Sequence, residues 1–118
     1  MNVNNMAQLI NYGREMLSIN TQKNTVEYST NGCSWNSRYT GSSAGIFYGL
    51  SQFGSELLAC TSKGIYYSTN EGRSWNSRYT GSLAGTFQQL STDGRYLLAT
   101  TSKGLYYSSN AGGGWNKR

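Results

Sequence analysis

Short runs of apolar and β-branched residues, separated by polar turn residues, recur along the whole chain. In the middle of the chain these runs cover residues 46–52, 56–61, 65–68 and 74–79. They are rich in Tyr, Phe, Leu, Ile and Thr, which suit a pleated, half-buried surface. Turn segments containing Gly or Asn separate them, and no run carries an apolar stripe with helical spacing. The pattern therefore predicts four short β-strands here and an all-β chain.

The same four-strand pattern occurs three times along the sequence. Trp35, Trp75 and Trp115 mark equivalent points that are 40 residues apart. The segments NSRYTGSSAG and NSRYTGSLAG, which follow the first two tryptophans, are identical at nine of ten positions. The first unit differs by two extra residues between Thr21 and Thr25 and by one missing residue before its tryptophan. A period near 40 residues is the length of one four-stranded propeller blade.

The repeats therefore predict one domain over residues 1–118, built as three four-stranded β-propeller blades over about residues 1–41, 42–81 and 82–118. Propellers typically have four to eight blades, and three blades would leave two apolar sheet faces bare. Since six is the multiple of three within that range, we expect two chains to close a six-bladed ring as a homodimer. The alternative is that the chain is a fragment of a longer tandem array.

Alignment of the units agrees with the two-chain ring. Arg118 aligns with Arg38 and Arg78, and Met1 aligns with position 42 of the second unit. Passing from one chain to the next would therefore skip only the equivalents of residues 39–41. The break would fall in a loop between blades, so each chain would contribute three whole blades.

A second motif precedes each tryptophan, of the form Ser-x-Asn-x-Gly-x-x-Trp. It resembles the Asp-box, or BNR, repeat S-x-D-x-G-x-x-W of sialidase-like and lectin-like β-propellers, with Asn in place of Asp. The motif residues are Ser68, Asn70, Gly72 and Trp75 in the second unit, Ser108, Asn110, Gly112 and Trp115 in the third, and Ser29, Asn31 and Trp35 in the first, which lacks one residue. The resemblance implies a propeller fold and covers nearly the whole chain.

We interpret these motif residues as structural. Ser and Asn oxygens can accept hydrogen bonds from turn N–H groups, Gly can take a positive φ, and Trp can fill the space between sheets. The alternative, that the tryptophans stack on ligand sugars, is less favoured because fold motifs recur across unrelated functions. In the sialidases that the motif resembles, these boxes also lie on the face opposite the active site.

Composition argues against catalysis and against cofactors. The chain has no His, so imidazole-based catalysis and imidazole metal sites are excluded. Two Cys cannot form a structural zinc site alone, and we expect no metal and no cofactor. Only five residues are acidic, and most fall at turns away from the basic loops, so no pair of carboxyl groups suited to glycoside hydrolysis is visible. We therefore expect a protein that is not an enzyme.

The cysteines and the N-terminal residues give information about the cellular location of the protein. Cys33 and Cys60 do not recur in the other units and fall at opposite ends of their blades, so they are predicted to be free thiols. No stretch reaches the roughly 18 apolar residues of a membrane span, and the first residues lack the pattern of a secretory signal. These observations favour the cytoplasm and no membrane partner, although they leave the location undetermined.

Basic and aromatic residues indicate a ligand face. The net charge is +5, and the second-to-third-strand turns and the loops between units should share one side of the propeller. The predicted ligand-binding residues on that side are Lys63, Lys103, Arg38, Tyr39, Arg78 and Tyr79. Arg and Lys can bind carboxylate or sulfate, and Tyr can stack on a sugar ring. We therefore predict non-catalytic, lectin-like binding of a glycan, including acidic glycans, with Lys23 a weaker candidate.

Two other functions remain open. The chain can be a structural or protein-interaction propeller, natural or engineered, that binds no ligand, because the sequence shows constraints of the fold more sharply than constraints of a site. Any single Lys is equally compatible with a solvated loop tip. Binding of nucleic acid or another polyanion ranks below glycan binding, because the chain has no dense basic run.

Overall fold

The computed structural model describes residues 6–12, 14–81 and 83–118, and these residues form three antiparallel four-stranded sheets. The first sheet contains β1 (Met6–Tyr12), β2 (Glu15–Asn20), β3 (Thr25–Ser29) and β4 (Asn36–Tyr39). The second contains β5 (Phe47–Phe53), β6 (Glu56–Thr61), β7 (Gly64–Ser68) and β8 (Asn76–Tyr79). The third contains β9 (Phe87–Thr92), β10 (Leu97–Thr101), β11 (Gly104–Ser108) and β12 (Asn116–Lys117).

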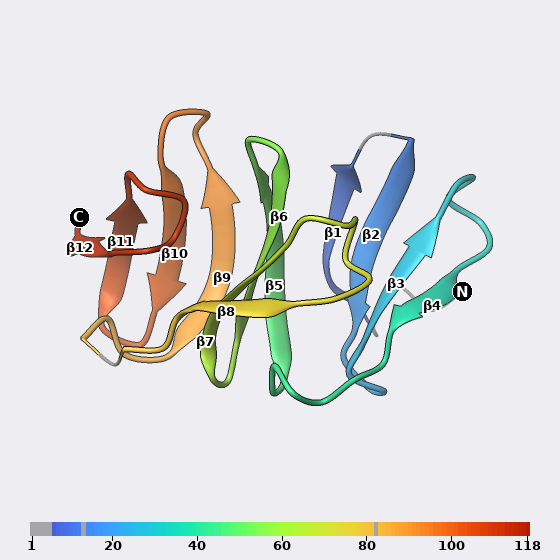
Figure 1. Ribbon diagram of the computed structural model, residues 1–118, viewed down its shortest axis with the longest axis horizontal. Coiled ribbons are helices and arrows are strands. Elements are labelled where there is room, and N and C mark those ends of the chain that lie inside the picture. Colours follow the sequence, from blue (N-terminus) through green and yellow to red (C-terminus); the bar gives the residue numbers. More distant parts are fainter. Residues whose placement is uncertain (1–5, 13, 82) are drawn as a thin grey trace.

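Each sheet is one propeller blade whose strands pair in chain order, and the blades stand side by side along the long axis of the molecule (Figure 1). The predicted fold class, all-β with three four-stranded blades, is confirmed. The predicted strands of the middle unit agree with β5 to β8 to within two residues at each end. We call the sheets blades 1, 2 and 3.

The core lies between the blades. Because side chains alternate across a strand, each blade has a leading face toward the next blade and a trailing face toward the preceding one. Between blades 1 and 2, the leading face of blade 1 packs on the trailing face of blade 2. This cluster contains Leu17, Ile19 and Val26 together with Phe47, Leu57, Ala59, Tyr66 and Trp75. The side chains of the first group are fully buried.

The interface between blades 2 and 3 repeats this arrangement. The leading face of blade 2 and the trailing face of blade 3 supply Leu58, Cys60 and Ile65, and Phe87, Leu90, Leu97, Ala99 and Tyr106. Two consecutive apolar interfaces thus hold the three blades together.

The Asp-box turns show why Asn can replace Asp. The Ser68 hydroxyl accepts hydrogen bonds from the backbone N–H groups of Asn70 and Gly72, at 3.3 and 2.9 Å. The Asn70 side-chain oxygen accepts the N–H of Ser74 at 3.0 Å. These bonds need an oxygen acceptor and no charge. The indole N–H of Trp75 donates to the Gly72 carbonyl at 3.0 Å, which ties the ring to the turn.

The turn of blade 1 is altered by its missing residue. In blades 2 and 3 that position holds Glu71 and Ala111, both with positive φ. Without it, the Ser29 hydroxyl still accepts the N–H of Gly32 at 2.8 Å. The buried indole N–H of Trp35, however, has no hydrogen-bond partner among the described residues. One deletion therefore leaves the turn intact but breaks the bond between the turn and the tryptophan.

We expect the substitution Trp75→Ala to lower the free energy of unfolding by about 3–5 kcal/mol, because it leaves a cavity in the interface between blades 1 and 2. The Trp75 side chain is 7% exposed, and its ring lies 5.4 Å from that of Phe47. Denaturant unfolding measures the loss. A variant as stable as the parent that no longer binds ligand would instead make this tryptophan a ligand residue.

The cysteines give a second test of the packing. Cys33 is exposed and Cys60 is buried, and both are free, as predicted. Burial between blades 2 and 3 raises the pKa of the Cys60 thiol to about 12. A thiol reagent at mildly alkaline pH should therefore titrate one cysteine in the native protein and two after unfolding. Rapid reaction of both thiols in the native protein would contradict this interface.

Candidate ligand site

The turns and loops of the three blades fall on two opposite sides. The β5–β6 and β9–β10 turns, which join the first and second strands of blades 2 and 3, lie at the top of Figure 1. The β2–β3, β6–β7 and β10–β11 turns lie at the bottom, together with the loops that join one blade to the next. We call this bottom surface the loop face. It is the side on which the sequence predicts ligand binding.

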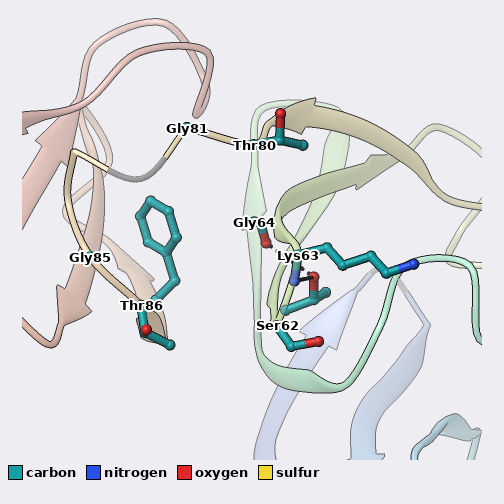
Figure 2. A pocket seen from close by; sticks show the side chains of 9 residues that line it. Ser62, Lys63, Gly64, Thr80, Gly81, Gly85 and Thr86 are labelled. Carbon is teal, nitrogen blue, oxygen red and sulfur yellow. Dashed lines mark hydrogen bonds between the residues drawn. The ribbon is translucent and has the colours of Figure 1, made fainter.

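A pocket of about 290 Å³ opens on the loop face between blades 2 and 3. Its lining comes from the β6–β7 turn, the end of β8 and the start of β9 (Figure 2). The lining residues are Thr61, Ser62, Lys63, Gly64, Thr80, Gly81, Gly85, Thr86 and Phe87. We call this cavity the junction pocket. It combines hydroxyl groups, exposed backbone and one aromatic wall.

Local bonds hold the β6–β7 turn in shape. The Thr61 hydroxyl accepts the N–H of Lys63 at 3.0 Å and donates to the Gly64 carbonyl at 3.3 Å. Gly64 has φ +129°, and a Cβ there would lie 2.1 Å from the Tyr79 carbonyl oxygen. This position therefore requires glycine, and the β6–β7 turn can approach β8 closely at the pocket edge.

The insertion in blade 1 changes the corresponding place between blades 1 and 2. The side-chain amide of Asn24 donates to the Gly45 carbonyl at 3.1 Å, and its oxygen accepts the N–H of Phe47 at 2.9 Å. Gly45 and Phe47 correspond to Gly85 and Phe87, which line the junction pocket. Asn24 thus bridges the gap between blades 1 and 2, whereas the equivalent gap between blades 2 and 3 stays open. The two junctions are unequal because of the insertion.

A second cavity, of about 340 Å³, adjoins the junction pocket. It is lined by Thr21, Phe47, Tyr48, Thr86, Phe87 and Gln88. Thr86 and Phe87 line both cavities, so the start of β9 separates them. Thr86 is exposed, whereas Phe87 is only 2% exposed, so the ring contributes little open surface to either cavity.

The structure does not bring Arg38 and Arg78 to this site. Both guanidinium groups point to the end of the blades opposite the loop face. Arg38 makes two hydrogen bonds to the Glu15 carboxylate, at 2.5 and 2.6 Å, and its side chain is 4% exposed. Arg78 pairs in the same way with Glu56, at 2.5 and 2.8 Å. Their predicted role as ligand-binding residues is therefore not supported by their placement.

These arginines join consecutive blades instead. Arg38 also donates to the Glu71 carbonyl of blade 2, and Arg78 to the Ala111 carbonyl of blade 3, both at 3.1 Å. A shift of strand register next to each arginine accounts for its direction, because an irregular strand turns a side chain away from its regular face. Each guanidinium also lies over a tyrosine ring of its own blade.

Tyr39 and Tyr79 are half-buried and brace the loops between blades. The Tyr39 ring packs edge-on against Phe47 at 5.8 Å, and its hydroxyl is 3.0 Å from that of Ser43. The Tyr79 ring packs against Phe87 at 6.0 Å. Each ring thus packs against the phenylalanine that begins the next blade.

Lys63 and Lys103 do lie exposed on the loop face. Their ammonium groups donate to the carbonyls of Ser43 and Leu83, at 3.2 and 3.3 Å, in the loops that precede their own blades. Figure 2 shows the Lys63 side chain extending away from Thr86. Lys63 therefore borders the junction pocket without pointing into it, and Lys103 is not among the residues that line either cavity. Lys23, the weaker candidate, is exposed in the β2–β3 turn.

The pocket residues that sequence reasoning missed are small and polar. Thr61, Thr80 and Thr86 resemble ordinary turn residues, and nothing in the local sequence sets them apart. The usable signal was the insertion in blade 1, because it implied that the loops at the two junctions differ.

The described residues contain neither a cluster of metal ligands nor a membrane-spanning helix. No group of three or more His, Cys, Asp or Glu side chains is placed to hold a metal ion in this part of the chain. None of its elements is a helix long and apolar enough to cross a membrane.

Solved structures confirm the class of fold that this geometry defines, an all-β chain of four-stranded, propeller-like blades. YCF48 from Cyanidioschyzon merolae is similar with a TM-score of 0.71 and 19% identity, over 94% of this chain and 36% of that chain. A structure described as YCF48 bound to D1 peptide is similar with a TM-score of 0.68 and 16% identity, over 92% and 38%. The chain thus spans less than two fifths of these proteins.

A computationally designed protein, Ika4, is also similar, with a TM-score of 0.56 and 12% identity, over 84% of this chain and 63% of that chain. No protein-family model and no curated protein matches the sequence. At these identities the likenesses establish the fold: three blades that resemble part of a propeller.

The Arg–Glu pairs make stability depend on acidity. The hydrogen bonds from Arg38 and Arg78 lower the pKa of Glu15 and of Glu56 below the ordinary value of 4.5. A carboxylate whose pKa is lower in the folded state stabilises the protein above its unfolded pKa, and this contribution disappears as the pH falls through the folded pKa. Acid should therefore weaken the two pairs that hold Arg38 and Arg78 in place within blades 1 and 2.

We expect Glu56→Gln to lower the free energy of unfolding at neutral pH by about 1.5–3 kcal/mol, since it removes hydrogen bonds to a charged group. The variant should also lose less stability than the parent when the pH falls below 4.5. Glu71→Gln is the matched control, because the Glu71–Arg73 pair is about half exposed and should contribute little. Denaturant unfolding across a range of pH measures the loss of stability in both variants. An equal loss in the two would contradict the role of Arg78.

Proposed function

We propose that this chain is a non-catalytic, lectin-like binding module that takes a glycan in the junction pocket, within a propeller ring completed by a second chain. The observation that carries the proposal is the pocket itself. Phe87, which is 2% exposed, closes the inner end of the pocket with an apolar group, and Thr80 and Thr86 are exposed among its lining residues. A sugar ring presents C–H groups and hydroxyls together, so it suits a wall of this mixed character.

The charge of the loop face favours an acidic glycan. The ammonium groups of Lys63 and Lys103 lie exposed there. Glu15 and Glu56 lie at the opposite end of the blades, where arginines neutralise them. A carboxylate or sulfate on the ligand would therefore approach a surface of mainly positive charge.

A scaffold without a ligand is the second candidate function. It is favoured by the placement of Arg38, Arg78, Tyr39 and Tyr79, whose side chains all contact the following blade. A propeller of this kind would offer its outer surfaces to another protein. Binding measurements separate the two candidates.

Thr86→Trp should block the junction pocket and reduce glycan affinity at least about tenfold, because the larger side chain takes up space in the pocket that Thr86 lines. Ile46→Trp is the matched control. Ile46 is the equivalent residue of blade 2, is 53% exposed and lies at the junction that Asn24 bridges. A glycan array identifies the ligand, calorimetry with the strongest hit measures affinity, and a thermal melt checks the fold.

The control protein should bind as the parent does. Equal loss of affinity in both variants would place the site elsewhere. A parent that retains no glycan on the array would contradict glycan binding and leave the scaffold as the function.

A further inference from the structure

We infer that the second cavity binds an apolar, ring-sized group joined to the sugar, so that the ligand is a glycoside with an apolar aglycone. The sugar lies in the junction pocket, and the aglycone lies in the second cavity, on the other side of Thr86. This inference rests on the glycan binding proposed above and adds the chemistry of the group next to the sugar. It is carried by the size, the lining and the position of the second cavity.

The volumes of the two cavities favour one ligand that occupies both. The junction pocket has about 290 Å³ and the second cavity about 340 Å³. Small-molecule sites usually have about 300–1,000 Å³, so each cavity alone is near the lower limit. A cavity of about 150 Å³ already holds a benzene ring. The second cavity therefore has room for a substituted aromatic ring beside a sugar in the junction pocket.

The open surface of the second cavity is mainly apolar. Phe47 and Phe87 line it but are almost completely buried, so Tyr48 supplies the aromatic surface that a ligand can reach. Tyr48 is half-buried and packs on the core cluster between blades 2 and 3. Its position is therefore held by the core, while part of the side chain stays open to the cavity.

The division of polar and apolar surface between the cavities matches the two parts of a glycoside. Lys63, Ser62 and Thr80 are exposed among the residues that line the junction pocket. None of the six residues that line the second cavity carries a charge. A sugar gains hydrogen bonds from the first kind of lining, whereas an apolar group is best placed where it covers no charged group.

The insertion in blade 1 builds one wall of the second cavity. It lengthens the β2–β3 turn, which begins at Thr21, and Thr21 lines the cavity together with the starts of β5 and β9. The side-chain oxygen of Asn20 accepts the N–H groups of Gln22 and Lys23, at 3.1 and 3.2 Å. At the other end of the turn, the side chain of Asn24 binds the backbone of blade 2. The turn is thus held at both ends before a ligand binds.

Thr86 marks the point where the two parts of the ligand join. Its N–H donates to the Ser102 hydroxyl at 2.9 Å, and its carbonyl accepts the N–H of Ser102 at 3.0 Å. These bonds fix its backbone, while its side chain is exposed and lines both cavities. A ligand that fills both cavities therefore crosses a single exposed side chain.

Benzyl alcohol tests the second cavity without a sugar. Titrated at millimolar concentration into the folded chain, it should shift the NMR amide signals of Tyr48 and Gln88 more than that of Lys63. Gln88→Trp should abolish the shift at Tyr48, because the larger side chain takes up space in the cavity that Gln88 lines. Gln89→Trp is the matched control, since Gln89 is the next residue of β9, is also exposed and lines neither cavity.

Methyl and benzyl glucuronide test whether one ligand spans both cavities. Both carry the carboxylate that the charge of the loop face favours, and they differ only in the aglycone. Calorimetry should show at least about tenfold tighter binding of the benzyl compound, because its ring buries apolar surface. Tyr48→Gln should remove most of this preference and leave the affinity for methyl glucuronide unchanged.

Tyr107→Gln is the matched control for Tyr48→Gln. Tyr107 is also half-buried, lies in β11 and lines neither cavity, so its replacement should keep the preference for the benzyl compound. Circular dichroism of all four variants checks that each is folded.

Three results would overturn the inference. These are the absence of benzyl alcohol shifts at Tyr48 and Gln88, equal affinities for the two glucuronides, or binding of benzyl alcohol without binding of either glucuronide. The glycan array tests the proposed function separately. A chain that binds glycans on the array but does not distinguish the two glucuronides contradicts the aglycone site and not glycan binding. A chain that binds benzyl alcohol and no glycan contradicts both glycan binding and a ligand that spans the cavities.

Discussion

Face-to-face packing of consecutive sheets is the interaction on which the rest of this structure depends. A four-stranded blade with apolar residues on both faces cannot cover both by itself, so each leading face needs a trailing face against it. Leu17, Ile19 and Val26 are fully buried because blade 2 lies over them. The arginine pairs then connect the same blades at one end, where Arg38 and Arg78 reach carbonyl groups of the following blade.

The candidate ligand site is a consequence of this packing. Two blades that meet face to face leave a gap where their loops diverge, and the residues of the loops decide whether the gap stays open. Asn24 bridges the gap between blades 1 and 2, whereas the junction pocket stays open between blades 2 and 3. The same scaffold thus produces unequal sites from nearly identical repeats.

Much of the fold was predictable because its determinants are local or periodic. The spacing of the tryptophans indicated three blades, and the Ser and Asn oxygens of the boxes make the turn hydrogen bonds expected of them. For the candidate site, the sequence predicted only the side of the molecule on which it lies. Arg38 and Arg78 lie in the expected strands, but a local shift of register turns them toward Glu15 and Glu56.

By itself, the sequence determined the number of blades, the strands within them, the turn chemistry and the free thiols. Each of these depends on residues a few positions apart or on the repeat period. Only the tertiary structure decided that the arginines join blades, that the tyrosines brace loops and that Thr86 and Phe87 line an open pocket. The partners of Arg38 are Glu15, 23 residues earlier, and Glu71, 33 residues later, and only the packing of blades brings them together.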